Sequence, residues 1–184
     1  MQITKASIAD IPQLVTLINS AYRGEESKKG WTTEAELLEG KRINAEGLEK
    51  IINTPNAVIL KCSNEEARPD DPVGRGNIIG CVYLKKNENK MYLGMLTVSP
   101  RLQSGGIGKL ILKASEEYAV ENNCDAIEMT VISVRHELIA WYQRHGYHDT
   151  GKRSPFPDDP LSTKKQELEF ITMEKSLYNN FKTN

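Results

Sequence analysis

One stretch of the sequence decides the fold: residues 96–109, which read LTVSPRLQSGGIGK. An apolar strand pattern ends at Val98, and an amphipathic helix pattern begins at about Gly106. Glycines between them permit positive φ angles and allow a ligand to approach the backbone closely. A helix N-terminus adds free N–H groups and the positive end of a dipole. The stretch is therefore suited to binding a pyrophosphate group.

Two common phosphate-binding loops do not fit this stretch. A Walker A loop needs glycine where Gln103 stands and a hydroxyl residue where Leu110 stands. A Rossmann fingerprint that starts at Gly106 needs its third glycine at the position of Ile111. These departures argue against a nucleotide triphosphatase, for which magnesium-nucleotide binding would be the discriminating observation.

The glycine loop resembles the CoA-binding signature of GNAT acetyltransferases, Gln/Arg-x-x-Gly-x-Gly/Ala, here starting at Gln103. Residues 96–100 resemble the Leu-x-Val-x-Pro strand that precedes that loop in the family. Residues 142–147 resemble the family's Tyr-x-x-x-Gly-Phe/Tyr element, and the order of predicted elements matches over nearly the whole chain. We therefore interpret the chain as resembling a GNAT enzyme.

The resemblance implies that acetyl-CoA is the cofactor. Leu96, Thr97 and Val98 would offer backbone groups to the pantetheine arm, and an N–H there would polarise the thioester carbonyl. The pyrophosphate would lie on the N–H groups of Gln103, Ser104, Gly105, Gly106, Ile107, Gly108 and Lys109. Many members carry Asn and Ala where this chain has Arg135 and Leu138. Arg135 is a hypothetical contact to a CoA phosphate.

Two residues are the candidates for proton transfer. Tyr142 matches the family tyrosine near the CoA sulfur, and its phenol would protonate the departing thiolate; the alternative is a buried structural tyrosine. Glu128 is a carboxylate among apolar strand residues, which makes it the candidate general base; the alternative is a solvent-facing side chain. His136 and His145 titrate in a suitable range but are weaker candidates for the base.

The acceptor site would be formed by residues 22–36 and by the loop around residues 155–157. We expect Tyr22 and Trp31 to line it, although Trp31 could instead pack on the first helix. Glu34, with Glu25 and Glu26, would attract a cationic amine, or these charges would only solvate a loop. The sequence shows no metal-ligand pattern.

Composition is ordinary for a globular protein: 184 residues, 39% hydrophobic, 27% charged and a net charge of −1. We expect no nucleic-acid and no membrane partner, since no basic excess, signal peptide or spanning segment is visible. The cysteines at positions 62, 81 and 124 are expected to be reduced and buried. These features predict a cytoplasmic protein, with a homodimer left open.

The predicted elements form one N-acetyltransferase domain over residues 1–184 of the α/β (α+β) class. We expect a mixed, mostly antiparallel sheet flanked by helices, with diverging central parallel strands. Predicted strands cover residues 2–6, 57–62, 78–85, 91–98, 126–132, 147–151 and 168–173. Predicted helices cover residues 8–22, 32–38, 45–52, 106–121 and 136–145; residues 25–29 and 63–77 are expected to be connections.

The predicted function is direct transfer of an acetyl group from acetyl-CoA to a primary amine of a small molecule, peptide or protein. The alternative is a non-catalytic acyl-CoA-binding sensor on the same fold. Release of thiol from acetyl-CoA in the presence of amines would separate the two. The sequence does not identify the acceptor.

Overall fold

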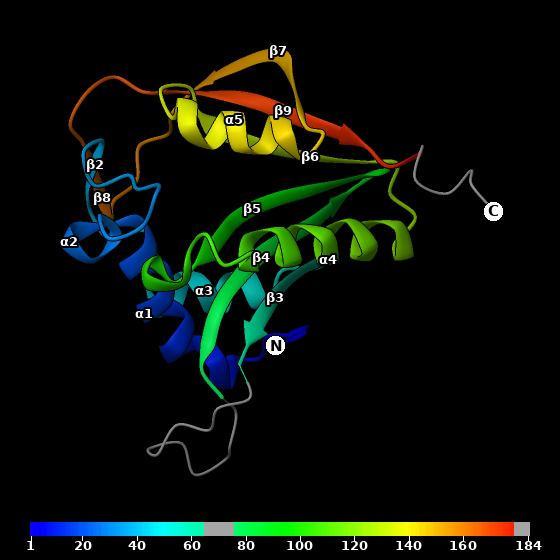
Figure 1. Cartoon of the computed structure of the whole chain (residues 1–184), viewed down its shortest axis with the longest axis horizontal. Coiled ribbons are helices and arrows are strands. Elements are labelled where there is room, and N and C mark those ends of the chain that lie inside the picture. Colours follow the sequence, from blue (N-terminus) through cyan, green and yellow to red (C-terminus); the bar gives the residue numbers. More distant parts are fainter. Residues whose placement is uncertain (65–75, 179–184) are drawn as a thin grey trace.

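The computed structural model describes residues 1–64 and 76–178, and its centre is a seven-stranded sheet (Figure 1). The strand order is β1-β3-β4-β5-β6-β9-β7, and a two-stranded sheet pairs β2 with β8. The strands are β1 (Gln2–Lys5), β2 (Leu38–Gly40), β3 (Ala57–Ser63), β4 (Ile78–Asn87), β5 (Lys90–Val98), β6 (Ala126–Ile132), β7 (His148–Pro155), β8 (Ser162–Lys164) and β9 (Glu169–Ser176).

Helices cover both faces of the large sheet. They are the 3₁₀ turn η1 (Ile8–Asp10), α1 (Ile11–Tyr22), α2 (Gly24–Ser27), α3 (Ala45–Ile52), η2 (Pro100–Leu102), α4 (Ile107–Glu121) and α5 (His136–Arg144). Alternation along the strands sends neighbouring side chains to opposite faces. Ile59 packs with α1 and α3, whereas the next residue, Leu60, packs in the cluster that contains α4.

The α4 face is closely packed because Gly80 on β4 leaves room for it. A Cβ atom at Gly80 would lie 2.5 Å from the Ile111 Cδ1 atom, which is too close for an unshifted structure. Ile111 and Leu112 are almost completely buried there. The exclusion of these apolar surfaces from water is a main source of stability on this face.

The observed sheet confirms the predicted fold class. Its only parallel neighbours among the described strands are β5 and β6, and the other pairs are antiparallel. The strands predicted over residues 78–85 and 91–98 flank a turn pattern that predicts a hairpin, and β4 and β5 form it. In Figure 1, β5 and β6 lie together at one end and move apart toward the end where α2, β2 and β8 lie.

Several local predictions were wrong. Gly24–Ser27 forms the short helix α2, although a loop was predicted there. The helix predicted near residues 32–38 is absent; Leu38 instead begins β2, which pairs with β8. The apolar residues of the helix predicted over residues 106–121 recur at helical spacing and place Leu110 on its buried side; Leu110 is instead 38% exposed, and Leu112 is buried. Because residues 110–112 are all apolar, the sequence does not show which of them face the core.

The first helical segment begins after Ser7, whose residue type and position before the apolar run predict an N-cap. The Ser7 backbone N–H donates to Asp10 Oδ2 at 2.8 Å, and the two residues form a capping box. Most of the connection predicted over residues 63–77 lies outside the described residues. Within the described ranges, no helix is both long and apolar enough to cross a membrane.

Candidate active site

The site is built where the two parallel strands stop pairing. The strands β5 and β6 are paired over only three positions, from Lys90 opposite Ala126 to Tyr92 opposite Glu128. Further along β5, the pairing with β4 jumps from Gly94 to Thr97, so two residues oppose one. This is a β-bulge, and a bulge bends its strand. The strand therefore leaves β6 and opens the sheet at this point.

Side chains hold the bulge in place. Met95 has a left-handed φ of 50°, which is uncommon for a residue other than glycine. Thr97 Oγ1 donates to the Met95 carbonyl at 2.8 Å, and the Tyr22 hydroxyl donates to the Leu96 carbonyl at 3.0 Å. Burial, reinforced by the charge of Glu34, raises the pKa of Tyr22 to about 12. The phenol therefore remains a hydrogen-bond donor at neutral pH.

The glycine loop leads directly into α4. Gly106 is the N-cap with a φ of 81°, and Ser104 also has a positive φ of 69°. The helix that follows is 15 residues long and has no acidic residue in its first turn. Its N–H groups and dipole are therefore free of a competing carboxylate at this end.

A cavity of about 440 Å³ runs from this loop to the bulge. Its lining includes Leu96, Thr97, Val98, Gln103, Ser104, Gly106, Gly108 and Lys109. Arg135 and Arg144 also line it, and no carboxylate does so among the described residues. The walls thus combine backbone groups with positive charge only, which fits a polyphosphate ligand such as CoA. We refer to it as the cofactor cavity.

A second cavity, of about 280 Å³, lies on the other side of the bulge. Its walls come from α1, β5, β6, the start of α5 and the segment after β7. Five residues line both cavities: Tyr22, Leu96, Arg135, Leu138 and Tyr142. The two cavities therefore adjoin at the bulge, and we call the second one the acceptor cavity.

Tyr142 lies at the junction. Its side chain is buried between Trp141 and Tyr147, with ring centroids 5.0 Å and 5.7 Å away. Burial raises its pKa above the ordinary value for tyrosine. The hydroxyl makes no hydrogen bond within residues 1–64 and 76–178, and the residue lines both cavities. A protonated phenol is thus placed where it could donate a proton.

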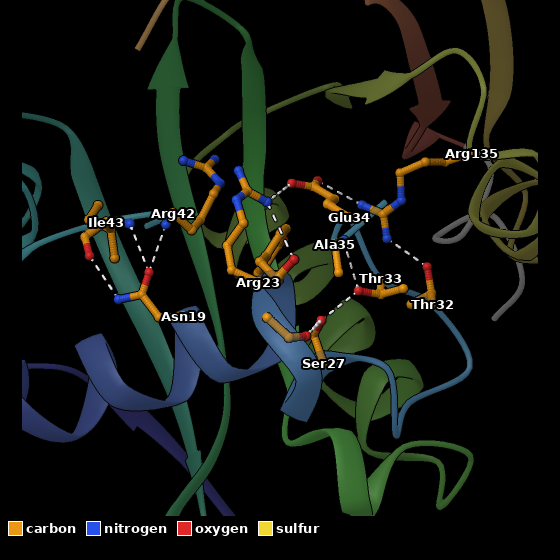
Figure 2. Close-up of polar contacts among 12 residues, drawn as sticks. Asn19, Arg23, Ser27, Thr32, Thr33, Glu34, Ala35, Arg42, Ile43 and Arg135 are labelled. Atoms are coloured by element: carbon orange, nitrogen blue, oxygen red, sulfur yellow. Dashed lines mark hydrogen bonds and ion pairs between the residues drawn. The ribbon is translucent and has the colours of Figure 1, made fainter. Parts of the chain in front are cut away.

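A buried charge network borders the junction (Figure 2). Glu34 lies between two guanidinium groups: it pairs with Arg23 Nη1 through Oε2 and accepts from Arg135 Nη1 through Oε1 at 2.8 Å. Arg135 Nη2 donates to Thr32 Oγ1 at 2.6 Å. The side chains of all three charged residues are at most 8% exposed. Glu34 therefore holds together the end of α1 and the start of α5.

The profile of the Acetyltransferase (GNAT) family matches residues 45–147, which is more than half of the chain. This chain belongs to the GNAT acetyltransferase family. Members of the family generally use acetyl-CoA, and the composition of the cofactor cavity agrees with that use.

One curated acetyltransferase resembles part of the chain in sequence. N-alpha-acetyltransferase 30 of Dictyostelium discoideum is 28% identical over 76 residues, which is 39% of this chain and 41% of that protein. The match thus spans less than half of the curated relative.

Solved structures of other acetyltransferases share the fold. The ribosomal-protein-S18-alanine N-acetyltransferase from Escherichia coli has a TM-score of 0.68 at 11% identity, covering 96% of this chain and 93% of its own. The ribosomal-protein-alanine N-acetyltransferase from Brucella melitensis has a TM-score of 0.66 at 17% identity, covering 96% and 99%. At such identities the likeness establishes the GNAT fold and not the acceptor.

The predicted site residues are not all brought together. Glu128 lines neither cavity; it pairs with Lys90 Nζ at 3.9 Å, where β5 and β6 are still joined. Trp31 was predicted to bind the acceptor, but it lines the cofactor cavity, with its ring 6.3 Å from that of Trp141. Its backbone N–H donates to Gln103 Oε1 at 2.9 Å, so residues 30–32 rest against the glycine loop.

The charged candidates have partners that the sequence did not reveal. Arg135 was predicted to contact a CoA phosphate. Its Nη1 and Nη2 groups instead donate hydrogen bonds to Glu34 and Thr32. Glu34, predicted to attract a cationic amine, is neutralised by two arginines. Sequence reasoning missed Arg23 and Arg42, which line the acceptor cavity. Each is a single arginine in a polar stretch, so no local pattern distinguishes it from a surface residue.

Proposed function

We propose that the chain is an N-acetyltransferase that moves an acetyl group from acetyl-CoA directly to a primary amine. The observation that carries the proposal is the meeting of two cavities at Leu96 and Tyr142. One cavity has the lining expected for a CoA ligand, and the other is of a size for a small acceptor or a short segment of one. Direct transfer requires the two reactants to be held side by side in this way.

Acetyl-CoA would supply the activated acetyl thioester. The backbone of residues 96–98 would orient its pantetheine arm, and the glycine loop with Lys109 would hold its phosphates. We propose that Tyr142 protonates the leaving sulfur, because its phenol is kept protonated by burial and faces both cavities. Since Glu128 lines neither cavity, the proposal leaves it out of the proton transfer.

The reaction class is tested by thiol release. Purified full-length protein would be mixed with acetyl-CoA and a panel of amines that includes small molecules and peptides with a free N-terminus. Acetylated product and free CoA in equal amounts are expected for at least one amine. Lys41 is exposed and lines neither cavity, so the variant Lys41→Gln is expected to release thiol as fast as the unchanged protein.

The competing function is an acyl-CoA sensor on the same fold, within one domain over residues 1–184. Acetyl-CoA binding without thiol release for any amine in the panel would favour it. The acceptor cavity argues for the enzyme, because a sensor needs no second cavity that opens onto the thioester position.

A further inference from the structure

The acceptor cavity has an excess of positive charge. Among the described residues, its ionised lining side chains are three arginines and two carboxylates: Arg23, Arg42, Arg135, Glu34 and Asp159. Glu34 is shared by Arg23 and Arg135. Arg135 also pairs with Glu137, which lies outside the lining, so Arg42 is the arginine left over. Arg42 is only half-buried, and an anionic ligand in the cavity would give this partly desolvated charge a partner.

Arg42 is the arginine that has no acidic partner. Its guanidinium lies 5.6 Å from the centroid of the Tyr22 ring, and it forms no ion pair within the described ranges. Its backbone N–H donates to Asn19 Oδ1 at 2.7 Å, which fixes the start of the side chain. Figure 2 shows Arg42 and Arg23 projecting from neighbouring segments beside this asparagine.

Arg23 also has unused hydrogen-bonding capacity. Two hydrogen bonds of the Arg23 side chain are described, and Nη1 donates both: one to Glu34 and one, of 3.4 Å, to the Tyr22 carbonyl. The Nε of Arg23 is buried without a hydrogen-bond partner; the Nε of Arg135 also lacks a hydrogen bond but lies 3.7 Å from Glu137 Oε1. Buried donors are rarely left unpaired in a protein. An arginine fork with free N–H groups is well matched to a planar oxyanion.

The position of these groups decides which part of an acceptor they would meet. Arg23 and Arg42 line the acceptor cavity but not the cofactor cavity. Both contact Tyr22, which lines both cavities, so an oxyanion bound by them would lie close to the junction where the amine must react. Asp159 Oδ1 accepts from the Leu161 backbone N–H at 2.8 Å, so one carboxylate of the wall is already engaged.

We propose that the acceptor is a small amine that also carries an oxyanion, a carboxylate or a phosphate, bound by Arg23 and Arg42. The inference rests on the proposed function and narrows its substrate class. It departs from the expectation that acidic residues attract a purely cationic amine. The small volume of the cavity favours an acceptor near the lower end of the usual ligand size.

Matched pairs of amines test the proposal. The carboxylate pairs are 4-aminobutyrate with 4-aminobutyramide and glycine with glycinamide; the phosphate pair is O-phosphoethanolamine with ethanolamine. For each pair, kcat/KM would be measured by thiol release, and binding to the CoA-saturated protein would be measured by calorimetry. In at least one pair, the charged member is expected to have a kcat/KM at least about tenfold higher than that of its neutral member. Whether this is a carboxylate pair or the phosphate pair identifies the oxyanion that the site binds.

Variants assign the preference to the arginines. Arg42→Gln is expected to reduce the charged-to-neutral ratio at least about tenfold, and Arg42→Lys to restore part of it, since lysine keeps the charge but not the fork. Lys41→Gln, next in the sequence but outside both cavities, is expected to leave the ratio unchanged.

Two different results separate this inference from the proposed function. Acetylation of neutral or cationic amines with no preference for charged members would overturn the oxyanion site and leave the acetyltransferase standing. Absence of all thiol release would contradict the acetyltransferase, and the calorimetric comparison would still decide the site. The oxyanion site would be refuted if the unchanged protein bound charged and neutral members equally. It would also be refuted if the preference for charged members survived Arg42→Gln.

Discussion

Arg135 Nη1 donates a hydrogen bond of 2.8 Å to Glu34 Oε1, although the two residues lie 101 positions apart in the sequence. With Arg23 on the other carboxylate oxygen, the bond joins the end of α1 to the start of α5. Both cavities have part of their walls on these two elements. The network therefore sets the width of the site as well as its charge.

Glu34→Gln is expected to destabilise the fold. The substitution leaves the buried Arg23 guanidinium without its described counter-charge and Arg135 with only the more distant Glu137, and breaking a buried pair costs about 3 kcal/mol. The measurement is the free energy of unfolding in urea. Glu36→Gln is the matched control, because the Glu36 side chain is 74% exposed and its ion pair is the surface one with Lys28, at 3.0 Å; little change is expected there. Equal stability of the two variants would contradict a structural role for Glu34.

Tyr142→Phe is expected to lower kcat by about 10²-fold, with little change in the KM for acetyl-CoA. The hydroxyl is the proposed proton donor, and the ring alone supplies the packing. Tyr147→Phe is the control, because Tyr147 is equally buried but lines neither cavity. A kcat that is unchanged in Tyr142→Phe on a genuine acceptor would show that the thiolate leaves without this proton.

The glycine loop and the strands around it could be predicted because their signals are local. Turn glycines, an apolar strand and an amphipathic helix occupy one continuous stretch, and each implies a backbone conformation on its own. The direction in which β5 leaves β6 could not be predicted from local patterns. It depends on a bulge at Met95, and methionine is not a residue type that indicates a bulge.

The charged half of the site could not be predicted because it is assembled from distant segments. Arg23, Glu34 and Arg135 become partners only when the end of α1 meets the N-cap of α5. The pairing of β2 with β8 is equally non-local, joining Leu38 to Lys164. Tertiary contacts of this kind override the short helix that local propensity favoured near residue 38.

Glu128→Gln is expected to change kcat by less than about twofold, well below the about 10²-fold loss typical of a missing general base. Glu128 is held in the paired part of the sheet, where Lys90 lies 3.9 Å from it and β9 presents Glu174 opposite it. The kcat would be measured with the best acceptor between pH 6 and pH 9. A large loss that grows toward low pH would reinstate Glu128 as the base.

The three cysteines are expected to resist thiol reagents in the folded protein at pH 8. All are buried, and burial raises the pKa of each thiol, that of Cys81 to about 12. The reactive thiolate is therefore scarce as well as inaccessible. Absorbance after addition of a chromogenic disulfide would show slow labelling without denaturant and three thiols per chain in urea. Fast labelling of one thiol in the native protein would contradict its burial.

Gly106→Ala is expected to raise the KM for acetyl-CoA about tenfold, equivalent to about 1.4 kcal/mol. Alanine at the observed φ of 81° costs about 1–2 kcal/mol of backbone strain, and relief of that strain would move the N–H groups away from the pyrophosphate. Gly151→Ala is the matched control: its φ is 84°, and neither glycine has an atom within 4 Å of the added Cβ. Gly151 lies in β7 and lines neither cavity. Both variants should therefore lose similar stability in urea, and only Gly106→Ala should lose affinity for the cofactor. A parallel rise in KM for both would mean that strain alone, and not the loop, is responsible.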